Sequence, residues 1–193
     1  MKRILFFAVA LMTAGIAKAQ FSTSIGYVFS PINDWDETYN AHGLNVELDY
    51  DYNLSPNLYV STGLGMDLSF YKISDNDSTF NGRIFDLTIP VDLNYRVNLG
   101  SDLKLNLFAG PTFMVGISHA FIYSGEKLTD YYSAANYPIK RYNVMLGGGV
   151  SLDIKNQYRI KVSYKKGLLD MDKSGEYPFK KDYLTVSVGY IFN

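Results

Sequence analysis

The sequence predicts an all-β protein, an eight-stranded antiparallel up-and-down β-barrel that spans a membrane. Three observations lead to this prediction. Apolar and aromatic residues alternate with small or polar ones from residue 21 onward, short and long connections take turns between the alternating segments, and the last segment ends on aromatic residues. Successive side chains of a strand point to opposite faces, so this alternation gives each strand a lipid-facing and a lumen-facing surface.

The first four predicted strands show the alternation clearly. Residues 21–30 place Phe, Ile and Tyr opposite Ser and Gly, and residues 44–52 place Leu, Val and Tyr opposite Asn, Glu and Asp. In residues 58–71 a mainly aliphatic face opposes Ser, Gly, Asp and Tyr, and residues 85–95 carry apolar side chains at odd positions. No helical period competes over a comparable length, so strands are expected.

The last four predicted strands continue the pattern. Residues 103–115 are mainly apolar at odd positions, and residues 142–152 alternate around a Gly-rich centre. Residues 158–164 alternate Tyr, Ile and Val with Arg, Lys and Ser, and residues 184–192 alternate to the end of the chain. The even number of strands would bring both ends of the chain to the same side of the membrane.

Residues 1–19 have the pattern of a secretory signal peptide, which leaves residues 20–193 as the barrel domain. Lys2 and Arg3 precede an apolar stretch, and Ala17-Lys18-Ala19 is a small-x-small cleavage site. A retained membrane anchor is the alternative, but the apolar stretch is shorter than the roughly 20 residues that a spanning helix needs. The chain has 0 Cys, which excludes a lipoprotein anchor, a disulfide framework and a thiolate metal site.

The composition narrows the possible partners. The whole chain has 18 Lys and Arg against 19 Asp and Glu, and removal of the predicted signal leaves it more acidic. No nucleic-acid partner is expected for such a chain. The mean hydropathy is near zero, as expected for a barrel whose two faces average out.

The connections between the strands predict the orientation in the membrane. The short ones are residues 53–57, 97–102 and 155–157, and the long polar ones are residues 32–43, 72–83, 118–140 and 169–181. Bacterial outer-membrane barrels have short periplasmic turns and long extracellular loops. The protein is therefore expected in the bacterial outer membrane, in contact with lipid and with both chain ends in the periplasm.

Aromatic residues indicate which face is turned outward, because a soluble lipocalin-like barrel would have the same alternation with its apolar face inside. With the short turns at the bottom, one group of aromatic residues lies near the lower rim: Phe21, Tyr50, Tyr52, Tyr95, Tyr158, Tyr190 and Phe192. A second group lies near the upper rim: Phe29, Phe70, Phe85, Phe113 and Tyr142. Two girdles of aromatic residues on either side of an aliphatic band are typical of a membrane-embedded barrel.

The last strand carries an assembly signal. Tyr190 and Phe192 continue a run of apolar residues at every second position. This ending resembles the C-terminal β-signal by which outer-membrane barrels are recognised for assembly, although Asn193 displaces the aromatic residue from the last position. The resemblance implies the barrel assembly machinery as a partner.

Three short motifs carry a resemblance to a known family. They are Phe85-Asp86-Leu87-Thr88-Ile89-Pro90, Leu107-Phe108-Ala109-Gly110-Pro111 and Leu146-Gly147-Gly148-Gly149-Val150. On these motifs the chain resembles the PorT-like outer-membrane β-barrel family common in Bacteroidetes. The resemblance implies an eight-stranded barrel in the outer membrane and little about activity, although one branch is linked to protein secretion. Since Pro cannot donate to the ladder, Pro90 and Pro111 also predict a local bulge.

Charged residues on the inward faces predict a filled lumen. Strands two to four place acidic residues there: Glu47, Asp49, Asp51, Asp67, Asp86 and Asp92. Strands five to seven place basic residues there: Lys104, Arg141, Arg159, Lys161 and Lys165. The tight turn at residues 155–157 would set Asp153 opposite Arg159. In a narrow interior such charges would neutralise each other, which favours a polar plug over a conducting pore.

The connection at residues 118–140 is the best candidate for a binding site. It contains five aromatic residues: Phe121, Tyr123, Tyr131, Tyr132 and Tyr137. Exposed Tyr-rich loops on a rigid scaffold suit recognition of a partner. The alternative is that these rings pack on one another and only extend the hairpin.

The sequence does not favour an enzyme. His42 and His119 are both expected in loops or at loop edges, and the neighbours Ser118 and His119 would point to opposite faces of a strand. No cofactor is implied and no metal-ligand spacing is present, since Asp75–Ser78 lacks the remainder of a calcium loop. We expect a monomeric, non-enzymatic protein whose loops bind a partner or support envelope or secretion assembly. A small passive channel and a lipid-modifying enzyme are the alternatives.

Overall fold

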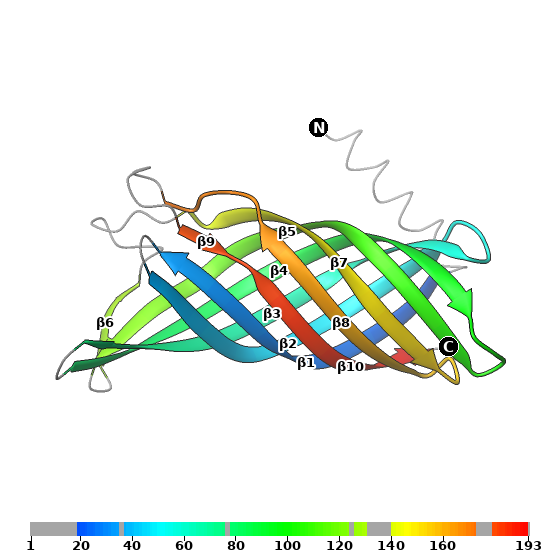
Figure 1. Cartoon of the computed structure of the whole chain (residues 1–193), viewed down its shortest axis with the longest axis horizontal. Coiled ribbons are helices and arrows are strands. Elements are labelled where there is room, and N and C mark those ends of the chain that lie inside the picture. The colour runs from blue at the N-terminus through cyan, green and yellow to red at the C-terminus, as the bar shows by residue number, and fades with distance from the viewer. Residues whose placement is uncertain are drawn as a thin grey trace, which may run out of the picture.

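The computed structural model describes residues 19–34, 37–75, 78–123, 126–130, 140–172 and 179–192. Eight of the strands in these ranges form the barrel wall: β1 (Ala19–Asp34), β2 (Glu37–Asn53), β3 (Leu58–Asp75), β4 (Ser78–Asn98), β5 (Leu103–Tyr123), β7 (Tyr142–Ile154), β8 (Tyr158–Gly167) and β10 (Tyr183–Phe192) (Figure 1). Two short strands are added to the wall: β6 (Glu126–Asp130), which pairs with β5, and β9 (Phe179–Lys181), which pairs with β1.

The barrel closes between its first and last strands. β10 pairs with β1 from Phe21↔Phe192 to Phe29↔Leu184, and every pairing around the wall is antiparallel. Closure between β1 and β10 leaves no unpaired sheet edge at the height where all neighbouring strands pair, which is what a strand structure needs in lipid. The predicted eight-stranded antiparallel barrel is confirmed. The described residues contain no helix with the length and hydropathy needed to cross a membrane.

The two faces of the wall are inverted relative to a soluble protein. Asp51 is only 1% exposed and Asn106 is fully buried, whereas Leu64 and Val188 are 48% and 58% exposed. Buried carboxylates beside exposed aliphatic side chains are expected where hydrocarbon surrounds the barrel and the polar face lines the lumen. This inversion excludes the soluble lipocalin-like alternative.

The two ends of the barrel differ in how far the hairpins extend (Figure 1). One end has short turns, such as the one in which Gln157 N–H donates to the Ile154 carbonyl at 3.0 Å, with Lys155 and Asn156 at φ 53° and 54°. Such left-handed residues match the twist of a tight hairpin. At the other end the strand pairing continues into long hairpins. β1 and β2 pair as far as Asp34↔Glu37, and β3 and β4 pair as far as Asp75↔Ser78.

The prediction of loops at residues 32–43, 72–83 and 118–140 was therefore wrong over much of their length. Strand pairing continues there, and within residues 169–181 a short strand, β9, forms as well. The physical reason is that the hydrophobic alternation is imposed by lipid contact, whereas backbone hydrogen bonds continue above the membrane between polar residues. Loss of alternation marks the edge of the bilayer and not the end of a strand.

The bulge predicted at the two prolines lies elsewhere. The register of β4 against β5 is the same on both sides of Pro90 and Pro111, and it shifts instead where Phe85 and Asp86 face Ser118 and Gly116. Gly110 absorbs the crowding near the prolines, because a Cβ there would lie 2.0 Å from the Val91 carbonyl oxygen. The glycine thus allows a close approach of the strands without an extra residue.

Candidate functional site

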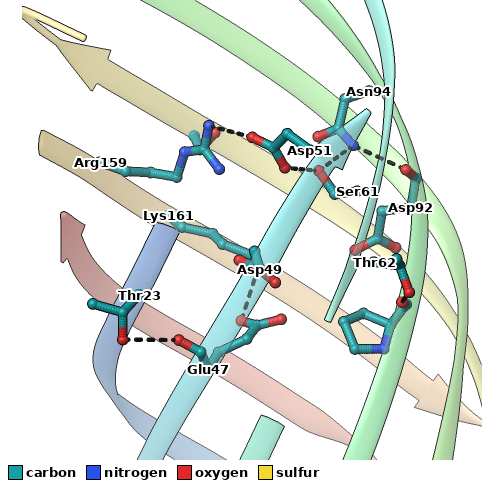
Figure 2. A network of polar contacts seen from close by, with 12 residues as sticks. Thr23, Glu47, Asp49, Asp51, Ser61, Thr62, Asp92, Asn94, Arg159 and Lys161 are labelled. Atoms are coloured by element: carbon teal, nitrogen blue, oxygen red, sulfur yellow. Dashed lines mark hydrogen bonds and ion pairs between the residues drawn. The ribbon is translucent and has the colours of Figure 1, made fainter. Parts of the chain in front are cut away.

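The lumen toward the short-turn end is filled by an ion-paired network centred on Arg159 (Figure 2). Arg159 Nε and Nη2 donate to the two oxygens of Asp153 at 2.7 and 3.1 Å, and Nη2 also donates to Asp51 at 3.1 Å. The three side chains are 6%, 3% and 1% exposed. Ser61 donates its hydroxyl to Asp51 and accepts from Asn94 at 3.1 Å. The buried charges are therefore paired across the lumen.

Lys161 forms the next layer of the network (Figure 2). Its Nζ lies 2.9 Å from Glu47 and 3.5 Å from Asp49, and 5.4 Å from the centroid of the Phe108 ring. Gly149 leaves the space for this ring, since a Cβ there would lie 2.7 Å from Phe108 Cζ. The ammonium group is thus held by two carboxylates and one aromatic face.

Two further lysines connect distant strands. Lys165 Nζ donates to Thr112 at 2.6 Å and lies 3.5 Å from Asp92. Lys181 of β9 donates to Asp86 at 2.6 Å, and both side chains are 1% exposed. Tyr183 also donates its hydroxyl to Asp86. Lys181 was not predicted from the sequence, because the recognised alternation ends at Leu184. The inward face of β10 nevertheless continues at odd positions through Tyr183 and Lys181 to Phe179.

The predicted lumen charges differ in their burial and their contacts. Eight of them take part in the ion pairs just described: Glu47, Asp49, Asp51, Asp86, Asp92, Arg159, Lys161 and Lys165, with Asp153 as the predicted partner of Arg159. Asp67 is buried and accepts from Asn45 at 2.9 Å and Thr88 at 3.4 Å. Lys104 is only half-buried. The prediction that Arg141 faces the lumen was wrong, because β7 begins at Tyr142 and Arg141 is exposed at the mouth.

The part of the lumen toward the long hairpins has a different filling. It is a cluster of mainly apolar residues: Val28, Ile32, Ala41, Tyr71, Ile84, Met114, Met145, Met171, Phe179 and Tyr183. His119 lies beside this cluster, 1% exposed, with Nε2 2.6 Å from the Tyr71 hydroxyl and its ring 6.1 Å from that of Phe179. The prediction of a loop position for His119 was wrong, since it points into the barrel from β5.

The remaining space in the charged lumen is small. Two cavities there have volumes of about 30 and 10 Å³, and are lined by side chains that include Glu47, Asp92, Lys161 and Arg159. A cavity of this size holds a water molecule or two at most. Among the described residues the lumen is therefore packed around its charges.

The other predicted site residues lie outside this network. Phe121 and Tyr123 belong to β5, where they pair with Gly82 and Phe80, but their side chains are not among those that the structure describes. Tyr131, Tyr132 and Tyr137 lie outside the described residues. Tyr190 and Phe192 face outward from β10, 41% and 50% exposed, with ring centroids 5.2 Å apart. His42 faces outward from β2, so its expected loop position was also wrong.

The comparisons with known proteins agree with this architecture. Residues 4–192 match the model of the outer membrane protein beta-barrel domain. The chain belongs to this outer-membrane β-barrel family. The predicted location in the bacterial outer membrane is thereby confirmed. No curated protein sequence matches the chain.

Solved structures of small barrels resemble the chain. Ail of Yersinia pestis, in complex with the heparin analogue sucrose octasulfate, has 17% identity and a TM-score of 0.55, over 91% of this chain and 99% of Ail. Neisserial surface protein A has 14% identity and a TM-score of 0.52, over 90% and 99%. The outer membrane enzyme PagL has 13% identity and a TM-score of 0.47, over 90% and 98%. Identities this low show a shared fold alone.

Proposed function

We propose that the protein is a non-enzymatic, non-conducting outer-membrane barrel whose extracellular hairpins bind a partner. One observation carries the proposal: most charges of the lumen are held in ion pairs across the barrel, while β4 and β5 each extend over 21 residues. About 9–11 residues suffice for a strand to cross the bilayer. The interior is thus occupied, and the surplus length stands above the membrane.

The partner is expected to meet the aromatic residues of the predicted binding segment, Phe121, Tyr123, Tyr131, Tyr132 and Tyr137. Tyr and Phe provide large contact areas at low cost in conformational entropy. A role in envelope or secretion assembly agrees with the PorT-like motifs. We further propose that residues 1–19 act as the signal peptide, that the barrel assembly machinery reads Tyr190 and Phe192, and that the barrel is a monomer.

Conductance tests the sealed lumen. The refolded protein in a planar bilayer should show no regular unitary steps, because the ion pairs leave no continuous water path. Steps that scale with salt concentration would replace the proposal by a passive channel. A mass shift of lipid A on expression would instead favour a lipid-modifying enzyme.

Cysteine labelling tests the orientation, and the chain has 0 native Cys to interfere. A membrane-impermeant maleimide added to intact cells should label Asn81→Cys, an exposed position in the long hairpin, and should spare Asn57→Cys, an exposed position in a short turn. Disruption of the outer membrane should make both positions reactive. The reverse pattern in intact cells would place the long hairpins in the periplasm.

Cross-linking tests the partner. Intact cells with the wild-type barrel should yield a cross-linked product that is lost when the five aromatic residues of the binding segment are replaced by Ser. The matched control replaces exposed lipid-side residues Leu146 and Val150 by Ala, which should leave the product unchanged. Equal cross-linking of both variants would remove the binding role of the segment.

A further inference from the structure

The barrel wall forks above the outer end of the β2–β3 ladder. The uppermost pair of that ladder is His42↔Phe70. Beyond it β2 pairs with β1 as far as Glu37↔Asp34, and β3 pairs with β4 as far as Asp75↔Ser78. The ends of the β1–β2 and β3–β4 hairpins consequently lie apart at the same end of the barrel (Figure 1).

A hollow of about 700 Å³ lies at this fork. Tyr39 and Tyr71, which contact each other with ring centroids 6.1 Å apart, belong to its lining, together with the outward-facing His42 and Phe70. Its volume is more than twenty times that of the larger lumen cavity, at about 30 Å³. The space is large enough for a ligand headgroup, whereas the lumen is not.

The hollow carries positive charge. Lys72 and Arg83 both line it and are exposed, and its described lining includes no Asp or Glu. In the β3–β4 ladder Arg83 is paired with Phe70, and Lys72 follows Phe70 on the same outward face. Among the described side chains, neither cation belongs to an ion pair. Two neighbouring cations that have no counter-charge among the described side chains form a ready site for an anion.

The height of the hollow indicates which anion reaches it. Phe70 and Phe113, 49% and 48% exposed, belong to the aromatic ring at the extracellular rim of the lipid-facing surface, and aromatic rings of this kind mark the headgroup region. Lys72 and Arg83 stand beside or just above that ring. His42 is fixed at the same level by its hydrogen bond with the Tyr27 hydroxyl and by the Phe29 ring, 5.2 Å away.

We infer that the hollow at the β2–β3 fork binds the phosphorylated headgroup of an outer-leaflet lipid. The planar guanidinium group of Arg83 can donate two parallel hydrogen bonds to a phosphate, and Lys72 adds a point charge. Phe70 offers an apolar surface to the attached sugar or acyl chain. Because β2 and β3 do not pair above His42↔Phe70, a lipid of the leaflet could reach the hollow between the two strands without leaving the membrane. This inference does not depend on the proposed partner of the hairpins.

Native mass spectrometry of the refolded barrel in a neutral maltoside detergent tests the inference. The probes are bisphosphorylated lipid A and the same lipid without its phosphates. The double variant Lys72→Gln, Arg83→Gln should retain lipid A at least tenfold more weakly than wild type. The matched control removes two exposed cations elsewhere, Lys166→Gln and Lys180→Gln, and should change retention less than twofold. Dephosphorylated lipid A should bind weakly to all three proteins.

Three results would overturn the inference. Equal loss in the double variant and its control would show unspecific charge attraction. Equal retention of the dephosphorylated lipid would show that the phosphates are not recognised. Full displacement of lipid A by millimolar inorganic phosphate would indicate a site for soluble anions. If the double variant fails to fold, as judged by heat-modifiable migration in gels, Arg83→Lys alone replaces it, and must weaken binding because it keeps the charge but loses the planar fork.

Discussion

Toward the short-turn end the lumen is filled by Arg159, Lys161 and their carboxylates, whereas toward the end with the long hairpins it is filled by Met114, Met145 and Met171 with aromatic neighbours. Both fillings bury their side chains, but they differ in how much geometry they demand. A buried ion pair must be matched in position and in hydrogen bonds, or its desolvation outweighs its attraction. Methionine side chains are flexible and fill irregular space.

The charged filling also joins parts of the wall that are far apart in the sequence. Arg159 and Lys161 of β8 reach across to Asp51 and Glu47 of β2, and Lys165 reaches Asp92 of β4. A shift of any of these strands by one residue would turn its charges toward lipid. The charged half of the lumen therefore specifies the register of the closed barrel, and the apolar half tolerates variation.

The largest effect is expected where the charged half is broken from one side. Arg159→Ala leaves Asp51 and Asp153 buried without their cation, and should lower the free energy of unfolding by about 3–5 kcal/mol. Urea unfolding in phospholipid vesicles measures the change. Lys166→Ala, which removes an exposed cation from the same strand, is the control and should cost less than about 0.5 kcal/mol.

Removal of the whole triad sharpens this result. Asp51→Leu, Arg159→Met and Asp153→Leu together leave no unpaired charge, so much of the lost stability should return. Because Arg159 contacts both carboxylates, the double variant Arg159→Met, Asp153→Leu still leaves Asp51 unpaired and should recover less stability than the triple variant. Additive losses in the triple variant would mean that the three residues do not act as a unit.

The sequence was sufficient to place most of this network. Alternation with a period of two assigns each side chain to a face, and the short turn at residues 155–157 sets Asp153 opposite Arg159 in the β7–β8 ladder. The failures have one cause. Lys181, His119 and Arg141 all lie where the lipid-imposed alternation fades, and there the sequence no longer shows whether a strand continues. The fork between β2 and β3 is invisible for the same reason, since it depends on pairing between polar residues.

The second largest effect is expected on the lipid-facing surface, in contrast to the charged lumen. Leu64→Arg places a charge at mid-height on the outer face, where no carboxylate can pair with it, and should cost about 2–4 kcal/mol. The control is Leu99→Arg, at an exposed position in a short turn, which should cost about 0–1 kcal/mol. Equal insertion of both variants into vesicles would contradict the assignment of faces.

A smaller effect is expected in the apolar half. Met145 is 1% exposed and packs among other methionines, which can move into the space that Met145→Ala creates. The loss should therefore lie near the lower end of the usual range, at about 2 kcal/mol. Met145→Leu keeps the volume and should cost less than about 1.5 kcal/mol. A loss for Met145→Ala as large as that for Arg159→Ala would mean that both halves are equally rigid.

The smallest effect tests where the charged half ends. Lys104 faces Asp153 directly in the β5–β7 ladder, yet both oxygens of Asp153 already accept from Arg159. Lys104 is half-buried, and within the described residues no ion pair includes it. Because its charge keeps contact with water, Lys104→Ala should change the free energy of unfolding by no more than about 0.5 kcal/mol. The same vesicle assay compares Lys104→Ala with Arg159→Ala. A loss of about 2 kcal/mol or more for Lys104→Ala would show that water does not reach this rim. The charged network would then extend to the end of the lumen.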